Sequence, residues 1–532
     1  MMAKAFRFSD MPPEIQLLIF KLFDRSTLHF TVQVNKKWHD MSADLLWKEP
    51  SISRITKLAS LPLRRRQYYA SKIERLQIRK LRITPVFDKL LFSSLQCLWL
   101  DGGAEMFRRA VHLVPYLGPR IRILAFRGCE LDSRSLNLIR VCCPDLVRIA
   151  ISGPLVRVDD IAFAFFIKSF SCLRQLYLCD MFDVSAATAM FKINTEVLAP
   201  KIERLDLMNL LDFPDPEPFR MFMMSCGSLQ HLNIQRWQRN WPLKLMTGSV
   251  LVHVLSENPL QHLIGDWLSP GLLEQIPVSP APFQSFGKLK SLKKSGCSSS
   301  ALTVLLQASS RLQHLELCLY DVSTHLFSFI GRQVQLRHLA ITSDTDDEVL
   351  SIAHLLALSS LTSLTYLEIT HRRRHAFLGV HGLDDDTFSR LVTGFSQLTT
   401  LVLALKSPNL SARSIRSLSQ ACPLLKRCAL IYDHDLYTWA STQTVPGPLF
   451  PNLVSLYLGS VLDRSAAGLF DPEDAFDMPA WLNGEITAMR LLNCVPRLER
   501  FGMERITGTG LMVKDVLVQT RPRRRLRPGG VA

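Results

Sequence analysis

The hexapeptide Leu-Arg-Gln-Leu-Tyr-Leu at residues 173–178 decides the fold, because its Leu-x-x-Leu-x-Leu spacing recurs along the chain. Leu176 and Leu178 are two residues apart, so in a strand both would lie on one face. This period is typical of stacked repeats, in which each unit buries its apolar side only against its neighbours. We therefore expect an elongated protein that presents a surface, and not a compact enzyme. The first residues of the sixteen copies, mostly 22–31 positions apart, are Ile73, Leu95, Ile121, Leu146, Leu173, Ile202, Leu229, Leu260, Leu289, Leu312, Leu336, Leu364, Leu398, Leu425, Leu453 and Leu498.

Residues 129–146 indicate how one repeat is built. Asp132 or Ser133 can cap a helix, Leu136 and Ile139 share its core face, and Pro144 ends it before the next strand. The order of strand, loop, helix and strand is that of the leucine-rich repeat. The Cys-Pro-x-Leu join at 143–146 and 422–425 resembles the cysteine-containing class of these repeats, which is found in many F-box proteins. The resemblance covers residues 73–510. It implies an α/β solenoid of about 16 repeats, with a curved parallel sheet on the concave side and helices outside.

A different pattern precedes the repeats. The segment 11–14, Met-Pro-Pro-Glu, predicts a helix start, because proline is tolerated in the first turn and an acid suits the positive end of the helix dipole. Residues 24–27 predict a break and a cap. A second short helix is expected from Leu28 toward Trp38, and a third around residues 41–47. So little chain buries only a small core, and part of its apolar surface should stay exposed. One apolar stripe of the first helix has i, i+3, i+4 and i+7 spacing: Ile15, Leu18, Ile19 and Leu22.

These residues resemble the F-box motif in order and spacing. Met11 stands where the family usually has leucine, and Asn35 where it often has cysteine. The resemblance implies a small all-α F-box of three helices, which docks on the Skp-type adaptor of a cullin–RING ubiquitin ligase while the rest of the chain captures a protein substrate. The alternative is that most of Leu18, Ile19, Leu28, Val32 and Trp38 simply form the core of a small helical bundle. The adaptor-binding residues that the resemblance implies are Met11, Pro12, Glu14, Ile15, Ile19, Leu22, Leu28, Val32, Val34, Trp38, Leu46 and Trp47.

The chain is thus expected to comprise a tail (1–7), an F-box (8–52), a linker helix (53–72), the solenoid (73–510) and a basic tail (511–532). Its 63 Lys and Arg against 47 Asp and Glu leave a net charge of +16, which favours acidic partners but does not by itself identify nucleic acid. We expect no secretory signal and no membrane span. The 12 cysteines then indicate a reducing compartment, the cytoplasm or the nucleus.

One column of residues is expected to face outward from the sheet. If the fourth and sixth motif residues point inward, the third and fifth point outward. Nine of the sixteen third-position residues are Arg or His, and none is acidic. We predict that this column receives an acidic or phosphorylated substrate segment, because arginine suits phosphate and carboxylate and histidine gains charge as pH falls. The alternative is an ordinary polar repeat surface. The candidate substrate-binding residues are Arg148, Arg204, His231, His262, His314, His338 and Arg427.

Other segments allow two interpretations each. The proline-rich stretch 276–282 and the acidic stretch 471–479 are candidate recognition loops, or tolerated surface insertions. The basic stretches 371–375 and 521–527 suit nuclear import, or are a solvated turn and a basic end.

No catalytic motif is recognisable. Asp384–Asp386 predicts a helix start, the cysteines at one fixed repeat position predict buried thiols, and three arginines separate His371 from His375. We therefore expect no catalytic residue, no cofactor and no metal. The function predicted is that of a substrate-recognition adaptor of an SCF-type E3 ubiquitin ligase, a non-catalytic subunit. The alternatives are a leucine-rich-repeat scaffold without a ubiquitin role and, less favoured, a nucleic-acid-binding protein.

Overall fold

The computed structural model defines two compact units, residues 1–259 and residues 260–532. The stretches 1–7, 276–282, 372–375, 471–479 and 511–532, for which loops or tails were predicted, lie outside the described residues. The structure describes residues 8, 11–51, 55, 57–58, 60–79, 89–101, 113–129, 131–153, 158–179, 184–208, 215–235, 247–265, 288–297, 299–319, 323–343, 349–371, 378–380, 382–406, 410–434, 448–461, 488–489 and 491–503.

The first unit begins with three short helices, α1 (Pro13–Leu22), α2 (Arg25–Thr31) and α3 (Lys36–Lys48). Asp24 caps α2 by accepting a hydrogen bond from the Thr27 amide at 2.8 Å, as the sequence predicted. Asn35 caps α3 in the same way, from the Trp38 amide at 2.9 Å. Trp38 therefore belongs to the third helix, and its predicted place at the end of the second is wrong. The buried core of the bundle is Phe20, Leu28 and Leu46.

Helix α5 (Leu63–Ala70) connects this bundle to the first repeat, inside the predicted linker 53–72. The Trp47 and Tyr69 rings stack with centroids 4.6 Å apart, and the Tyr68 hydroxyl donates a hydrogen bond to Asp40. Lys48 is paired with Glu74 at 2.7 Å, just before the first strand. The bundle is therefore packed against the start of the solenoid through α3 and is not merely tethered to it.

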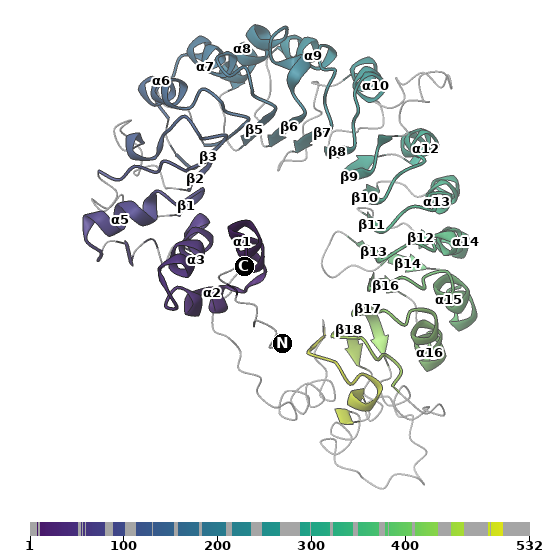
Figure 1. Cartoon of the computed structure of the whole chain (residues 1–532). Coiled ribbons are helices and arrows are strands. Elements are labelled where there is room, and N and C mark those ends of the chain that lie inside the picture. The colour runs from purple at the N-terminus through teal and green to yellow at the C-terminus, as the bar shows by residue number, and fades with distance from the viewer. Residues whose placement is uncertain are drawn as a thin grey trace, which may run out of the picture. The chain divides into compact units, whose positions relative to one another are not determined.

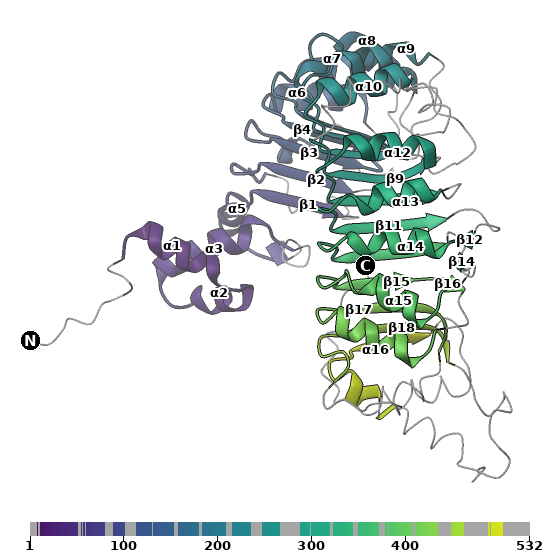
Figure 2. The same cartoon turned by 90° about the vertical axis from the view of Figure 1, so that its right-hand side faces the viewer.

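The rest of the first unit is a parallel sheet with helices on one side. Figures 1 and 2 show its strands along the inner side of the unit and its helices along the outer side. The strands pair in sequence order: β1 (Arg75–Arg79), β2 (Cys97–Asp101), β3 (Ile123–Arg127), β4 (Arg148–Ser152), β5 (Gln175–Cys179), β6 (Arg204–Met208) and β7 (His231–Gln235). The helical segments are η4 (Val114–Tyr116), α6 (Ser133–Cys142), α7 (Asp160–Lys168), α8 (Val184–Asn194), η5 (Ala199–Lys201), α9 (Glu217–Met224) and α10 (Gly248–Glu257).

The second unit repeats this plan. Its main sheet contains β8 (His262–Gly265), β9 (Ser291–Cys297), β10 (His314–Leu319), β11 (His338–Ser343), β13 (Tyr366–His371), β15 (Thr400–Leu403), β17 (Arg427–His434), β18 (Ser455–Val461) and β19 (Arg500–Met503). Its helical segments are α12 (Ser299–Ala308), α13 (Thr324–Gly331), α14 (Ile352–Ala357), η7 (Leu358–Ser360), α15 (Asp385–Val392) and α16 (Ala412–Ala421). A small parallel sheet that the sequence did not predict comprises β12 (Val349–Leu350), β14 (Leu378–Val380) and β16 (Leu405–Lys406).

Every one of the sixteen main-sheet strands begins two residues after its predicted first leucine or isoleucine. In the copy at 173–178, Leu173, Leu176 and Leu178 are completely buried, whereas Gln175 and Tyr177 are only partly covered. The predicted helix start at Asp384 is also confirmed, because its carboxylate accepts from the Thr387 amide at 2.8 Å. The predicted leucine-rich-repeat solenoid is therefore confirmed.

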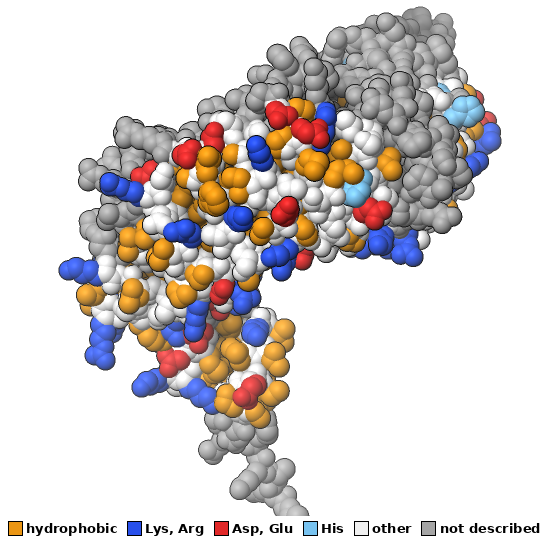
Figure 3. Space-filling model, turned by 90° about the horizontal axis from the view of Figure 1, so that it is seen from above, with side chains coloured by type: hydrophobic (Ala, Val, Ile, Leu, Met, Phe, Trp, Pro, Cys, Tyr) orange, Lys and Arg blue, Asp and Glu red, His pale blue; other side chains and the backbone are white. Residues whose placement is uncertain are grey.

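The outer helices leave some apolar side chains exposed. Examples in the first unit are Val141 on α6, Ile161 and Phe165 on α7, and Met221 on α9. Figure 3 shows apolar side chains interspersed with charged ones on the face seen from above. Among the residues that the structure describes, no helix is both long and apolar enough to cross a membrane.

Close stacking of adjacent repeats predicts a glycine requirement after α15. A Cβ atom on Gly394 would overlap the carbonyl oxygen of Ser359 in the preceding repeat, whereas a Cβ on Gly227 would meet no atom within 4 Å. We expect Gly394→Ala to lower the free energy of unfolding by about 1–3 kcal/mol, which is typical of overpacking. Gly227→Ala is the matched control and should change it little. Chemical denaturation of the full chain measures both, and equal stability of the two variants would contradict the close approach.

Candidate functional site

The first candidate site is an apolar face of α1 that points away from the bundle core. The exposed fractions of Ile15, Leu18 and Leu22 are 44%, 55% and 85%. The helix is turned so that Gln16 and Phe20 are the buried pair. The Gln16 amide donates hydrogen bonds to the carbonyl oxygens of Phe8 at 3.1 Å and Met11 at 2.7 Å. The bundle-core alternative holds for Leu28, Val32 and Trp38, which lie in or against the core, but not for Leu18. Gln16 and Phe20 occupy the inward positions of α1.

The structure divides the residues that carry the F-box resemblance into two groups. The core and the residues packed against it include Leu28, Val32, Trp38, Leu46 and Trp47, and Met11 and Ile19 are partly buried. The exposed group contains Pro12, Glu14, Ile15, Leu22 and Val34. Two further exposed apolar residues were not among the predicted adaptor-binding residues, Leu18 and Phe30. Phe30 lies on the short helix α2. The residue one turn before it, Ser26, is polar, so the sequence of α2 contains no apolar repeat that would have predicted an exposed apolar residue there.

The second candidate site is the inner sheet face of the first unit. Arg148, Gln175, Arg204 and His231 are paired in register on β4 to β7, as the motif spacing predicted. The neighbouring fifth-position residue Asp206 is not exposed, however, since its side chain is only 1% accessible. Its carboxylate is 2.5 Å from the Arg204 Nε and 3.3 Å from the His231 Nε2. The amide of Asn233 also donates to it, at 2.8 Å.

These contacts decide the ionisation of Asp206. Burial by itself raises the pKa of this carboxyl, but the hydrogen bonds from His231, Arg204 and Asn233 outweigh burial, and the net pKa is lowered. The aspartate is therefore ionised at neutral pH. It balances the positive charge of Arg204, so that Arg204 is not a free cation on this face.

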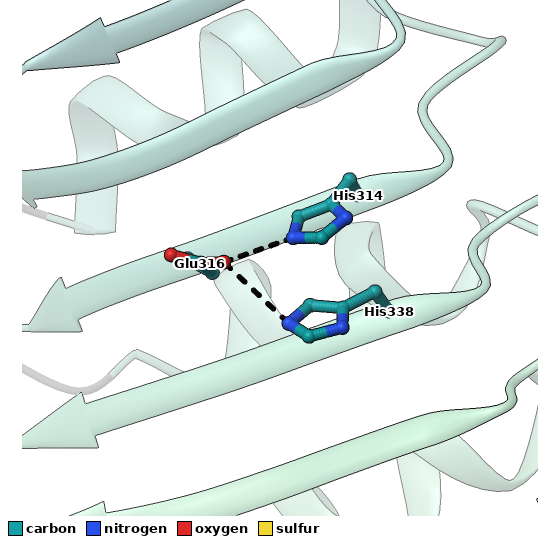
Figure 4. A group of neighbouring side chains, drawn as sticks. All are labelled: His314, Glu316 and His338. Carbon is teal, nitrogen blue, oxygen red and sulfur yellow. Dashed lines mark hydrogen bonds and ion pairs between the residues drawn. The ribbon is translucent and has the colours of Figure 1, made fainter. Parts of the chain in front are cut away.

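In the second unit, three rings form a stack along the inner sheet face, and Figure 4 shows two of them, His314 and His338. His314 and His338 have centroids 3.8 Å apart at 12°, and His338 and Tyr366 have centroids 4.0 Å apart at 10°. In-register pairing explains the stack, because the three residues occupy the third position of the adjacent strands β10, β11 and β13. The predicted column continues through Ser291 to His262 on one side and through Thr400 to Arg427 on the other.

Glu316 lies in the middle of this stack. Its Oε1 is 2.9 Å from the His314 Nε2, 3.6 Å from the His338 Nε2 and 3.1 Å from the Lys293 ammonium. The hydrogen bond from His314, assisted by Lys293, lowers the pKa of Glu316 to about 2 even though burial opposes this. Burial and the neighbouring His314 lower the pKa of His338 to about 4. At neutral pH the cluster is therefore an ionised glutamate with an uncharged His338.

Asp206 and Glu316 make the predicted column less cationic than the sequence indicated. Arg204, His231, His314 and His338 each face a carboxylate from the fifth position of the same or the adjacent strand. Over the described part of the chain, no ion pair links a carboxylate to Arg148 or Arg427. His262 is exposed on β8. Asp206 and Glu316 were not among the predicted site residues. The i, i+2 patterns Arg-x-Asp and His-x-Glu on one strand were the signal that could have found these pairs.

The repeat-position cysteines are packing residues. Burial raises the pKa of the Cys143 thiol to about 11 and of the Cys226 and Cys422 thiols to about 12. Such thiols are protonated at neutral pH and fill space between helix and strand, as the sequence predicted.

Comparison with known protein families supports the F-box resemblance of the N-terminal bundle, which carries the first candidate site. The F-box-like family model matches residues 8–53. Among solved structures, a chain of the yeast Rad7 and Elc1 complex has 15% identity, covers 87% of this chain and 97% of its own, and has a TM-score of 0.41. An internalin (InlF) of Listeria monocytogenes has 13% identity, with 83% and 89% covered and a TM-score of 0.32. No curated protein matches the chain. The chain thus carries an F-box-like domain followed by leucine-rich repeats. The repeats are assigned from the parallel sheet and its repeated leucine motif, not from these similarities.

Asp206 provides a prediction for the inner face of the first unit. We expect Asp206→Asn to lower the free energy of unfolding by about 1–3 kcal/mol at neutral pH, because buried donors lose an ionised acceptor. Because the folded-state pKa lies below the ordinary 3.8, the wild-type advantage is complete above that pH and disappears as pH falls through the lowered pKa. Denaturation at pH 7 and at acid pH measures the difference. Glu203→Gln, at a more exposed acid three residues earlier, is the control, and an equal loss there would contradict the assignment.

Proposed function

We propose that this protein is a substrate-recognition adaptor of an SCF-type ubiquitin ligase, whose F-box binds a Skp-type adaptor and whose repeats bind a protein substrate. The observation that carries the proposal is the F-box-like domain with an apolar face turned outward at Ile15, Leu18 and Leu22. A face of this kind is stabilised when a partner covers it, at about 25 cal/mol per Å² of apolar surface removed from water.

The packing of α3 against α5 and the first repeat supports a role in positioning. The Lys48–Glu74 pair and the Trp47–Tyr69 stack join the F-box to the start of the repeats, so the two proposed binding surfaces of the first unit would be held by packing as well as by the chain. A protein held on such a scaffold experiences a raised local concentration of the ubiquitin-conjugating enzyme. The chemistry would belong to the partners, and this subunit would be non-catalytic. The cytoplasm or the nucleus suits such a role and the many free cysteines.

The adaptor hypothesis predicts the effect of charges on α1. The double variant Ile15→Asp, Leu22→Asp should lose co-purification with a Skp-type adaptor, because two carboxylates would have to be desolvated in an apolar interface. Both side chains are exposed, so the melting temperature should change little. Val141→Asp, at another exposed apolar residue on α6, is the matched control and should retain the adaptor. Retention by the double variant would contradict docking through this face, and a bound adaptor without any ubiquitinated client under proteasome inhibition would favour a scaffold role.

We further propose that the inner sheet faces contact an acidic or phosphorylated segment of the substrate. Arg148 in the first unit and Arg427 in the second are the arginines of the predicted set that no ion pair to a carboxylate occupies in the described residues. Arginine without an internal partner can donate two parallel hydrogen bonds to a carboxylate or phosphate. Arg204, His231, His314 and His338 would contribute less, because Asp206 and Glu316 already hold them.

This ranking can be tested on the client proteins. Proximity labelling with and without residues 8–52 should identify clients that accumulate when the F-box is absent. Arg148→Glu and Arg427→Glu, made separately, should each reduce labelling of acidic or phosphorylated clients at least about tenfold. Repulsion between the new carboxylate and the client's negative charge should cost more than about 1.4 kcal/mol of binding free energy. Arg204→Gln is the control and should have a smaller effect. Undiminished labelling by both glutamate variants would exclude an acidic ligand at these positions.

A further inference from the structure

Three metal-compatible side chains converge on the inner sheet face of the second unit. His314 and Glu316 lie two residues apart on β10, so they share a face, and His338 is the in-register partner of His314 on β11. Their ligand atoms, two imidazole nitrogens and a carboxylate oxygen, all lie within 4.8 Å of one another. Figure 4 shows both imidazoles directed at the same carboxylate.

We propose that His314, Glu316 and His338 form a Zn²⁺-binding site. Two imidazole nitrogens and one carboxylate oxygen are a known zinc donor set, with three protein ligands and an open fourth position. Zinc bonds of about 2.0–2.2 Å in a tetrahedron place the donors about 3.3–3.5 Å apart. The Glu316 Oε1 is 2.9 Å from one imidazole nitrogen and 3.6 Å from the other, which brackets that separation.

The site needs only a small rearrangement to receive the ion. The two rings stack at 3.8 Å and 12°, so one imidazole must turn to direct its nitrogen lone pair at the metal. Rotation about the Cβ–Cγ bond of histidine is a soft torsion with broad minima. Access is open, because the side chains of His314, Glu316 and His338 are 29%, 27% and 24% exposed. The fourth position would face solvent.

Lys293 distinguishes this site from an ordinary ion-pair cluster. Its ammonium is 3.1 Å from the Glu316 oxygen that the metal would use. It therefore occupies the carboxylate while the ion is absent, and it repels the incoming cation. Removal of this charge should strengthen zinc binding. If the cluster only stabilised the sheet, removal of Lys293 would have no such effect.

The related cluster in the first unit does not meet the same requirements. Asp206 is almost completely buried, and Arg204 lies 2.5 Å from its carboxylate. Among the described residues, His231 is the one imidazole that contacts it. A divalent ion there would face a guanidinium that cannot lose its proton. This cluster provides an internal negative comparison.

The test uses the full chain, purified without a histidine tag and with accessible cysteines blocked, because an exposed free cysteine such as Cys172 can also bind zinc. Zn²⁺ is titrated against a competing chelator, and Co²⁺ absorption reports the coordination of the same site. We expect one equivalent of bound metal. His338→Ala and Glu316→Gln should weaken binding at least about tenfold, since loss of even an outer partner typically costs that much. His231→Ala and Glu368→Gln, an acid on β13 of the same face, are the controls that should retain it.

Lys293→Met provides the second measurement, which does not depend on loss of a ligand. We expect it to tighten Zn²⁺ binding severalfold while the melting temperature of the metal-free protein stays the same or falls. Equal zinc affinity in the wild type and in both His338→Ala and Glu316→Gln would overturn the proposal. Weaker zinc binding by Lys293→Met would overturn it as well. Neither outcome depends on adaptor binding, so the zinc-site proposal and the proposed function are tested independently of each other.

Discussion

The structure depends on burial of the leucine triplets between adjacent repeats. A single repeat cannot bury its own apolar side chains. Leu173, Leu176 and Leu178 are buried because parallel strands pair with both edges of β5. In-register pairing follows from this constraint, since a slip by one residue would expose the buried set. Register in turn decides which side chains become neighbours on the inner face. The ring stack of His314, His338 and Tyr366 is a direct consequence of core burial on the opposite side.

The same constraint limits how charge can be arranged. Strands about 4.8 Å apart place successive cations of one column close together, and like charges at that spacing repel. The fifth-position acids Asp206 and Glu316 relieve this repulsion locally. The inner face is therefore divided into charge-balanced clusters and separate arginines. A net charge of +16 describes the chain but not this pattern.

The N-terminal bundle is constrained by its small size. In the described part of this bundle, the buried core cluster is small, Phe20, Leu28 and Leu46, and the side-chain amide of Gln16 donates two hydrogen bonds on the inner side of α1. The apolar residues that remain cannot be covered by the bundle itself. Its third helix is instead engaged by α5 and the first repeat, which leaves the α1 face available for a partner. A domain too small for a large core thus gains rigidity from the solenoid.

The sequence by itself determined the position of every main-sheet strand, because a period-two apolar pattern requires burial and burial requires stacking. It also determined the capped starts of several helices, such as those at Asp24 and Asp384, since these depend on contacts between residues three apart. Only the tertiary structure decided which side of α1 faces inward, because Gln16 gains its partners from chain outside the helix. It also decided that Asn233 and His231 contact Asp206, and that Lys293 and His338 contact Glu316. Those four contacts join residues roughly one repeat apart, which no local pattern specifies, unlike the i, i+2 pairs Arg204–Asp206 and His314–Glu316.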